Sequence, residues 1–254
     1  MSVMHQPAQA DMTAKPVATR ASPFDVVRGF AVILAIPLLI GGVVIAAIAR
    51  LAGAAVRRRR PPVSAVMTGA ALAAYAWRVR PWMLTWGSTP EERARTLPGD
   101  EFAPGAPGRS TRAVTIEAPV ASVWPWVAQL GQDRGGFYSY SWLENLAGCR
   151  MTNADRIHPE WQHRAVGDTV LLHPANGLKV TRFEPGRVLA LEGWGAFVVE
   201  PGGPGRTRLL ARAHSQRGLA QRVMTLLIEV PHFVMERRML LGIKERAERA
   251  TPSR

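Results

Sequence analysis

Five short strand-like runs, one directly after another, most constrain how this chain of 254 residues can fold. Within each run apolar side chains alternate or cluster, and Pro, Gly or Asn-Gly turn signals separate one run from the next. Short strands joined by tight turns pair with their neighbours in the chain, so the runs predict an antiparallel meander. They cover residues 168–173, 178–183, 188–192, 196–200 and 207–214.

A single long helical pattern, residues 219–248, follows the strand-like runs. It contains no glycine before Gly242, and we expect a kink at Pro231. Its apolar face is too wide to be left in water, so the helix is expected to lie across the sheet. Another strand at 112–117 and a helix at 120–130 precede the meander, and the predicted fold class is therefore α+β.

The soluble domain is predicted to span residues 109–250. The preceding segment, 81–108, is rich in turn residues and has little apolar periodicity, which is typical of a linker. It carries one predicted short helix at 91–96, with Thr89 as the N-terminal cap and acidic residues in the first turn. Residues 50–80 form a basic loop followed by a second apolar helix.

An uncharged apolar stretch, FAVILAIPLLIGGVVIAAIA, occupies residues 30–49 between Arg28 and Arg50. As a helix it would be about 30 Å long, which matches the hydrocarbon core of a bilayer. We expect a transmembrane helix after a disordered tail, 1–29. A cleaved secretory signal fits less well, because the apolar segment is too long and arginines follow it directly.

The arginine run 57–60 determines the expected orientation, since basic loops stay on the cytoplasmic side. The apolar segment 61–77 leaves two topologies open: with one span the domain is cytoplasmic, and with two spans it lies outside. We favour one span in the cell membrane and a cytoplasmic domain. Residues 65–77 would then lie on the membrane surface, anchored by Tyr75, Trp77 and Trp82.

Several functional classes are excluded by composition and spacing. The single cysteine, Cys149, can form neither an intrachain disulfide nor a thiolate metal cluster. His158, His163 and His173 match no ligand spacing, so no metal is predicted. The net charge is +13, yet glutamates interrupt the basic residues of the last helix, which argues against nucleic-acid binding. No phosphate loop or dinucleotide fingerprint is present, and no cofactor is expected.

Several strings between residues 80 and 250 resemble a known superfamily. The strand ending in VTIEAP (114–119), the helix beginning ASVWPWVAQLG (121–131), the meander and the last helix are similar to the START-like, helix-grip superfamily. That superfamily (SRPBCC) includes polyketide cyclases and dehydratases, plant hormone receptors and lipid-transfer domains. Three strings resemble a membrane-anchored, actinobacterial-type branch of it: RPWMLTWGSTPEE (80–92), GQDRGGFYSYSWLENLAGC (131–149) and HFVMERRMLLGIKERAE (232–248).

This resemblance implies a curved antiparallel sheet wrapped around the C-terminal helix, with an apolar cavity between them for a hydrophobic small molecule or lipid. Large apolar side chains would line the cavity, and tyrosine and tryptophan add polar atoms that orient a ligand. The same side chains would serve equally well as ordinary core. The candidate ligand-binding residues are Trp124, Phe137, Tyr138, Tyr140, Trp142, Met224, Ile228, Met235 and Met239.

A polar stripe on the last helix raises the question of catalysis. Glu229, His232 and Glu236 lie one helical turn apart, and the carboxylates would favour a protonated histidine. If the stripe faces the cavity, His232 together with Tyr138 or Tyr140 could move a proton or polarise a carbonyl. A solvated polar face is the commoner explanation and the one we favour, so none of the three is assigned as catalytic.

We therefore expect a membrane-tethered domain that binds a hydrophobic small molecule or lipid without turnover. The alternative is a cyclase- or dehydratase-like enzyme that uses tyrosine and histidine acid–base groups in the same cavity. A third possibility is an adaptor with a filled core, whose basic surface meets anionic lipid or another protein. The ligand and the oligomeric state stay open at this point.

Overall fold

The computed structural model describes residues 62–250 and a few scattered positions between 42 and 57. The predicted tail, 1–29, and most of the predicted span, 30–49, lie outside the described residues. Among the residues that are described, no helix is long and apolar enough to cross a membrane. The N-terminal span therefore stays a prediction.

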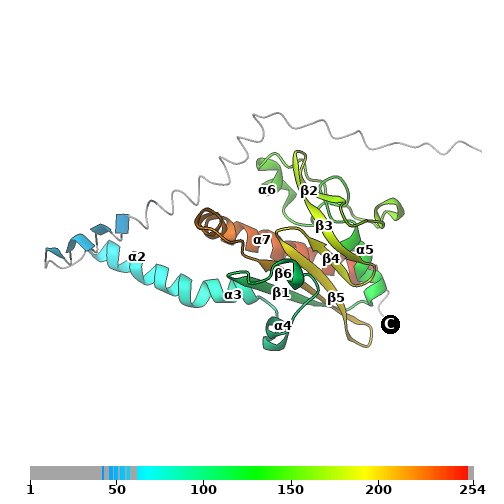
Figure 1. Cartoon of the computed structure of the whole chain (residues 1–254), viewed down its shortest axis with the longest axis horizontal. Coiled ribbons are helices and arrows are strands. Elements are labelled where there is room, and N and C mark those ends of the chain that lie inside the picture. Colours follow the sequence, from blue (N-terminus) through cyan, green and yellow to red (C-terminus); the bar gives the residue numbers. More distant parts are fainter. Residues whose placement is uncertain are drawn as a thin grey trace, which may run out of the picture.

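Six antiparallel strands form one curved sheet in the order β1-β6-β5-β4-β3-β2 (Figure 1). Strands β2 to β6 pair in chain order, which confirms the meander, and β1 pairs with β6 at the other edge. Every predicted strand is present. The bounds are Arg109–Ile116 (β1), Thr169–His173 (β2), Asn176–Glu184 (β3), Val188–Leu191 (β4), Gly195–Gly203 (β5) and Arg206–His214 (β6).

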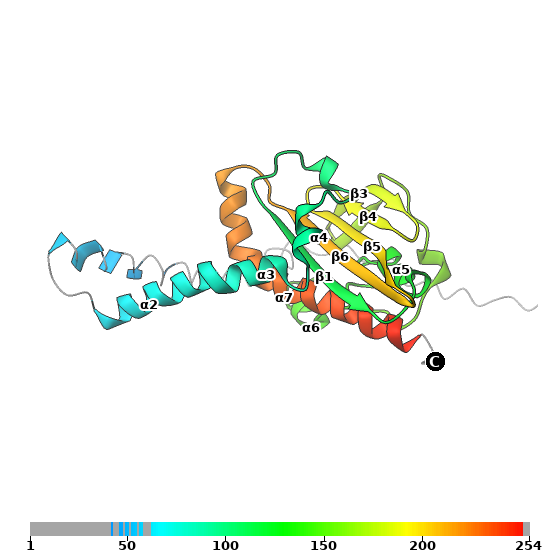
Figure 2. The same ribbon diagram turned by 90° about the horizontal axis from the view of Figure 1, so that it is seen from below.

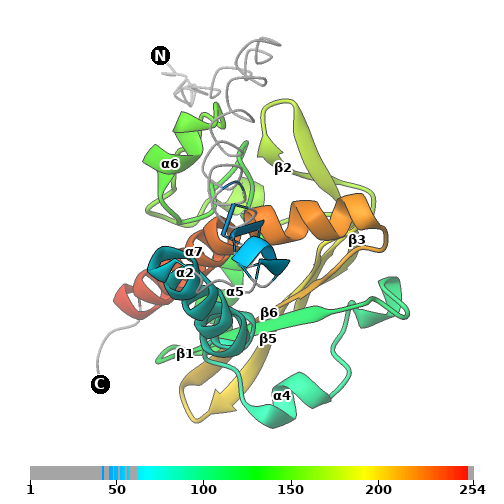
Figure 3. The same ribbon diagram turned by 90° about the vertical axis from the view of Figure 1, so that its left-hand side faces the viewer.

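The long helix α7, Leu219–Arg249, lies across one face of this sheet, which we call the inner face (Figure 3). In the main hydrophobic core, Leu240 and Ile243 of α7 join Ile116 of β1 and Leu209 of β6, and all four are fully buried. The predicted α+β class, a curved antiparallel sheet with a long C-terminal helix, is confirmed.

Helix α7 bends between its first third and the remainder, in the region of Pro231 (Figure 2). Proline removes a backbone hydrogen bond, and its ring clashes with the preceding turn, so a kink is expected there. The apolar face predicted for the whole helix is consequently buried only beyond the bend. Several apolar side chains of the first third are exposed to solvent, namely Leu219, Val223, Met224, Leu226 and Val230.

Three short helical segments lie between β1 and β2. Helix α5, Val120–Ala128, contacts α7, β5 and β6, and its Val123 and Val127 are fully buried in the main core. Helix α6, Ser141–Leu146, and the 3-10 turn η3, Pro159–Trp161, follow it. The helix predicted at 120–130 and the role of its apolar face are confirmed.

A helical rod precedes the sheet and projects away from it (Figures 1 and 2). It consists of α2, Val63–Ala74, the π-helical turn η1, Tyr75–Val79, and α3, Arg80–Thr85. Only its last element, α3, contacts β1 and α7 strongly, where Trp82 packs edge-on against Phe233 with ring centroids 5.1 Å apart. The rod is therefore held to the domain by one end.

The segment predicted as a linker, 81–108, in fact covers the outer face of the sheet with its later part. It contains α4, Pro90–Ala94, which Thr89 caps as predicted, and the 3-10 turn η2, Asp100–Phe102. Leu97 is buried in a second hydrophobic cluster made by side chains of the outer face: Ala113, Val188, Ala190, Ala196, Val198 and Leu210. Both faces of the sheet are thus covered.

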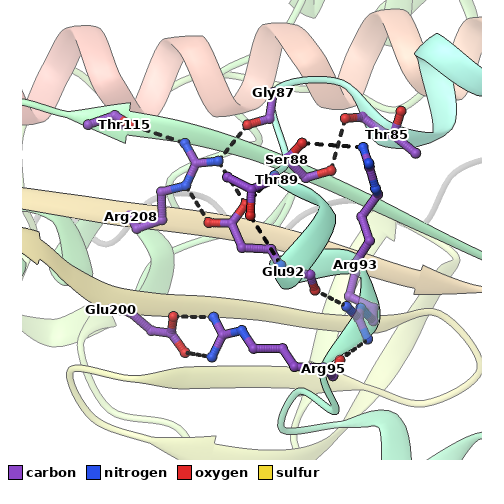
Figure 4. A network of polar contacts seen from close by, with 11 residues as sticks. Thr85, Gly87, Ser88, Thr89, Glu92, Arg93, Arg95, Thr115, Glu200 and Arg208 are labelled. Atoms are coloured by element: carbon purple, nitrogen blue, oxygen red, sulfur yellow. Dashed lines mark hydrogen bonds and ion pairs between the residues drawn. The ribbon is translucent and has the colours of Figure 1, made fainter.

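Arginine–carboxylate contacts between the strands and this covering segment hold it in place (Figure 4). Arg208 of β6 donates to a carboxylate oxygen of Glu92 in α4 at 2.6 Å and to the hydroxyl of Thr115 at 3.0 Å. Arg95, just after α4, makes a two-bond ion pair with Glu200 of β5. These contacts join residues about a hundred positions apart, so the segment belongs to the folded domain.

The loop before α6 packs closely on α7 at Gly242. A Cβ at this position would come within 2.3 Å of the carbonyl oxygen of Tyr138, so only glycine fits. Tyr138 itself adopts a left-handed backbone conformation, with φ of 54°. One residue further on, the Ser139 hydroxyl donates to the carbonyl oxygen of Met235 at 3.0 Å. This packing brings the loop against the polar stripe of α7.

Candidate functional site

A cavity of about 240 Å³ lies between the inner face of the sheet, α7, and α6 with its flanking loops. Most of its wall is apolar, and four polar side chains interrupt that wall. The apolar lining residues are Phe137, Met151, Leu172, Leu178, Leu191, Trp194, Phe197, Met235 and Met239. The polar ones are Ser139, Glu144, His232 and Glu236.

The local folding rules explain why these side chains meet. Alternation along a strand places Leu191 and Phe197 on the inner face, with Trp194 in the turn between them. Trp194 packs on Phe197 with ring centroids 4.6 Å apart. On α7, residues three or four apart share one side of the helix, which brings His232 and Met239 to the same wall. The bend in α7 lies at one end of this wall.

A buried ion pair between Arg112 and Glu236 forms the polar edge of the cavity. Arg112 of β1 is 1% exposed and Glu236 is 4% exposed. The Arg112 guanidinium donates to Oε1 of Glu236 at 2.9 Å and to the carbonyl oxygen of Met83 at 2.7 Å. Oε2 of Glu236 accepts no hydrogen bond from the described residues, and lies 3.4 Å from Nε2 of His232.

His232 stands between this ion pair and the aromatic wall. Its Nε2 lies 3.2 Å from the indole N–H of Trp194, and its Nδ1 lies 3.4 Å from the Arg112 guanidinium. Both neighbours can only donate, which disfavours a second ring proton. Burial lowers the pKa of His232 most; Glu236 raises it and Arg112 lowers it further. His232 is therefore a neutral imidazole at neutral pH, in contrast to the protonated ring that the glutamate spacing predicts.

Glu144 of α6 places a second carboxyl group in the cavity wall. Its Oε2 is buried and has no hydrogen-bond partner among the described residues. Burial alone raises the pKa of Glu144 from 4.5 to about 7, since no basic side chain acts in the opposite direction. Burial, with the charge of Glu144, also raises the pKa of the Cys149 thiol to about 11, so this cysteine is an unreactive thiol near pH 7.

The interpretation of the α7 polar stripe as a solvated face is wrong for its carboxylates. Glu229 is buried and pairs with Arg80 of α3 at 3.1 Å, and Glu236 is buried against Arg112. Each pairs through one oxygen with an arginine more than a hundred positions away in the chain, and a helical pattern alone does not reveal such a partner. Of the stripe, His232 and Glu236 line the cavity.

The structure places Tyr138 outside the cavity. Its hydroxyl donates to the carbonyl oxygen of Trp126 at 3.2 Å, its ring meets the Trp126 ring edge-on, and Arg246 lies over its face. Burial raises the pKa of Tyr138 above its ordinary value. The side chain is committed to the core and offers no proton to the cavity.

Three of the nine candidate ligand-binding residues line the cavity, Phe137, Met235 and Met239. The other six do not. Tyr140 and Trp142 are 38% and 65% exposed, and Trp124 packs on the ring of Phe183. Met224 and Ile228 precede the bend in α7, which carries them away from the cavity.

Sequence reasoning missed Glu144, Arg112 and Trp194. A signal existed for Arg112, because alternation along the strand places it on the same face as the apolar Val114 and Ile116. A charged residue in that line indicates a buried partner. No comparable signal marks Glu144, which is one polar residue in a short helix.

The described residues contain no group of three or more His, Cys, Asp or Glu side chains that could hold a metal ion. The site is thus an apolar cavity with one neutral imidazole, one paired carboxylate and one carboxyl without a partner. Comparisons with protein-family models, with curated proteins and with solved structures found no match to this chain.

Proposed function

We propose that this protein is a membrane-tethered, START-like helix-grip domain that binds a hydrophobic small molecule without chemical turnover. The observation that carries the proposal is the cavity of about 240 Å³ between the sheet and α7, with a largely apolar wall. Well-formed apolar pockets with a few polar groups are the usual ligand sites.

The cavity volume limits the ligand. An apolar cavity of about 150 Å³ is enough for benzene, whereas pockets for drug-sized ligands hold about 300–1,000 Å³. A cavity of about 240 Å³ suits a molecule with one or two rings, or one end of a longer chain. Leu172 in the cavity wall is part-exposed, so the end of a longer ligand would extend out of the cavity past β2.

An acid–base enzyme in the same cavity is the second candidate. In its favour, the neutral imidazole of His232 lines the cavity together with Glu144, whose carboxyl has a pKa of about 7. Against it, neither tyrosine that would assist His232 lines the cavity, and Trp194 and Arg112 already surround both ring nitrogens. Binding without turnover requires none of these groups to move, and we prefer it for that reason.

Tethering to a membrane rests on the uncharged stretch 30–49 and on apolar surface in the described part of the chain. Trp77 of the helical rod is 84% exposed, and Leu219 at the start of α7 is 79% exposed. The rod and the first third of α7 project from the same end of the domain (Figures 1 and 2). Exposed tryptophans and aliphatic side chains beside Arg78 fit an interfacial position at a bilayer.

Titration with 1-ethylnaphthalene, a neutral two-ring probe, tests ligand binding directly. We expect the full-length chain to bind it with a stoichiometry of one by calorimetry, and Met235→Trp to abolish binding by filling the cavity. Met224→Trp is the matched control, because Met224 lies on the same helix but outside the cavity. Equal heats for all three folded proteins, or none for any, would overturn the proposal.

A further inference from the structure

The carboxyl groups of the cavity place a chemical requirement on its ligand. Oε2 of Glu144 and Oε2 of Glu236 are both buried, both belong to lining residues, and neither has a hydrogen-bond partner among the described residues. Buried polar atoms are normally satisfied, so an acceptor left without a partner on a cavity-lining residue can be satisfied by a donor that a ligand brings.

The two carboxyls differ in how their charge is balanced. The Arg112 guanidinium lies 2.9 Å from Glu236, so that carboxylate is already paired. Glu144 is influenced by burial alone, with no basic neighbour acting on it. An ionised Glu144 in an apolar wall costs free energy until a positive charge joins it. Glu144 is therefore the group in this cavity that gains most from a cationic ligand.

The remaining polar groups of the cavity do not favour a negatively charged ligand. Ser139 directs its hydroxyl to the carbonyl oxygen of Met235, and the indole N–H of Trp194 is directed to His232. Neither donor is left over for a negatively charged ligand. The Arg112 guanidinium is occupied by Glu236 and the carbonyl oxygen of Met83.

We infer that the ligand is a hydrophobic amine, whose ammonium group binds the carboxylate of Glu144 while its rings or alkyl chain fill the apolar part of the cavity. This inference rests on the proposed binding function and names the class of molecule it serves. Aromatic faces support it, because Trp194 and Phe137 line the same space and a cation is attracted to an aromatic face.

The test compares 1-naphthylmethylamine with 1-ethylnaphthalene, which has the same number of heavy atoms and no charge. Binding of both probes is measured by calorimetry at pH 8 on the full-length chain. Met235→Trp, prepared in the same way, is the blank that corrects for unspecific partitioning. We expect the amine to bind about ten-fold more tightly, as one charge-assisted hydrogen bond provides. In Glu144→Gln the two affinities should become equal while that of 1-ethylnaphthalene is unchanged.

Two results would overturn the inference and leave ligand binding intact: equal affinities in the unmodified chain, or a preference for the amine that survives Glu144→Gln. A failure of both probes to bind is a different outcome, since it removes the proposed function itself. Glu192→Gln is the matched control for the lost charge, because Glu192 is exposed and does not line the cavity.

Discussion

The two faces of the sheet are covered in different ways. The outer face carries small side chains, among them Ala113, Ala190 and Ala196, and Leu97 of the irregular covering segment packs in the same cluster. The inner face is covered by a helix, which cannot follow a curved sheet along its whole length. Large side chains such as Trp194 and Phe197 occupy that face, and a cavity still remains.

The carboxylates of the two faces also differ, in how completely their oxygens are paired. On the outer face both oxygens of Asp100 have partners, Arg212 at 2.7 Å and His214 at 3.0 Å. On the inner face Glu236 bonds through one oxygen only, and Oε2 of Glu144 has no partner among the described residues. The complete pairing of Asp100 fits a structural role, and the unpaired oxygen of Glu144 supports the binding role that we propose for the cavity.

Removal of Arg112 should have the largest effect on stability. Arg112→Met leaves the carboxylate of Glu236 buried without its ion-pair partner, and loss of one member of a buried pair costs about 3–5 kcal/mol. Urea unfolding monitored by circular dichroism gives this difference. The double variant Arg112→Met, Glu236→Met should recover most of the loss, because no charge is then left unpaired. A single variant as stable as the unmodified chain would contradict the assignment.

Larger side chains should destabilise the outer face more than the inner face, and both effects should be smaller than the loss of Arg112. Ala190→Leu on the outer face has no space to enter, and overpacking of this kind costs about 1–3 kcal/mol. Leu178→Phe adds volume next to the inner cavity, so its cost should stay below about 1 kcal/mol. Thermal unfolding of both variants gives the order. The comparison of the two faces fails if Leu178→Phe is the more destabilising change.

Local sequence patterns were sufficient for most of the fold. Alternation gave all six strands, and the run after Leu219 gave a helix with a bend at Pro231. The cover of the outer face was not predicted, because an irregular segment has no periodicity and only one of its side chains, Leu97, is deeply buried there. The exposure of the first third of α7 was not predicted either, because the position of a proline predicts a kink but not the direction in which the helix turns.

The buried ion pairs of α7 could not be predicted from sequence patterns, for a different reason. Arg112 and Glu236 are 124 positions apart, and Arg80 and Glu229 are 149 apart. A solvated charge and a buried paired charge look the same in one sequence. Only the topology, which places β1 and α3 against α7, shows that these glutamates are buried.

The pH dependence of stability should show the smallest effect and the most specific one. The folded-state pKa of Glu144 is about 7, above its ordinary 4.5, so the native state holds this proton more tightly than the unfolded chain does. Its contribution is therefore fully present below pH 4.5 and is lost as the pH rises through 7. A shift of this size corresponds to roughly 3 kcal/mol for a fully buried group, and partial exposure reduces it to about 1–2 kcal/mol.

Urea unfolding at pH 5 and pH 8 measures this contribution, with Glu144→Gln as the comparison. Other groups titrate in the same interval, so the informative quantity is the difference between the two proteins at each pH. The variant should lose about 1–2 kcal/mol less than the unmodified chain between the two values. Addition of 1-naphthylmethylamine at pH 8 should remove this difference in the unmodified chain, because the ammonium group compensates the carboxylate. Parallel pH profiles for both proteins would show that Glu144 is in water and faces no apolar cavity.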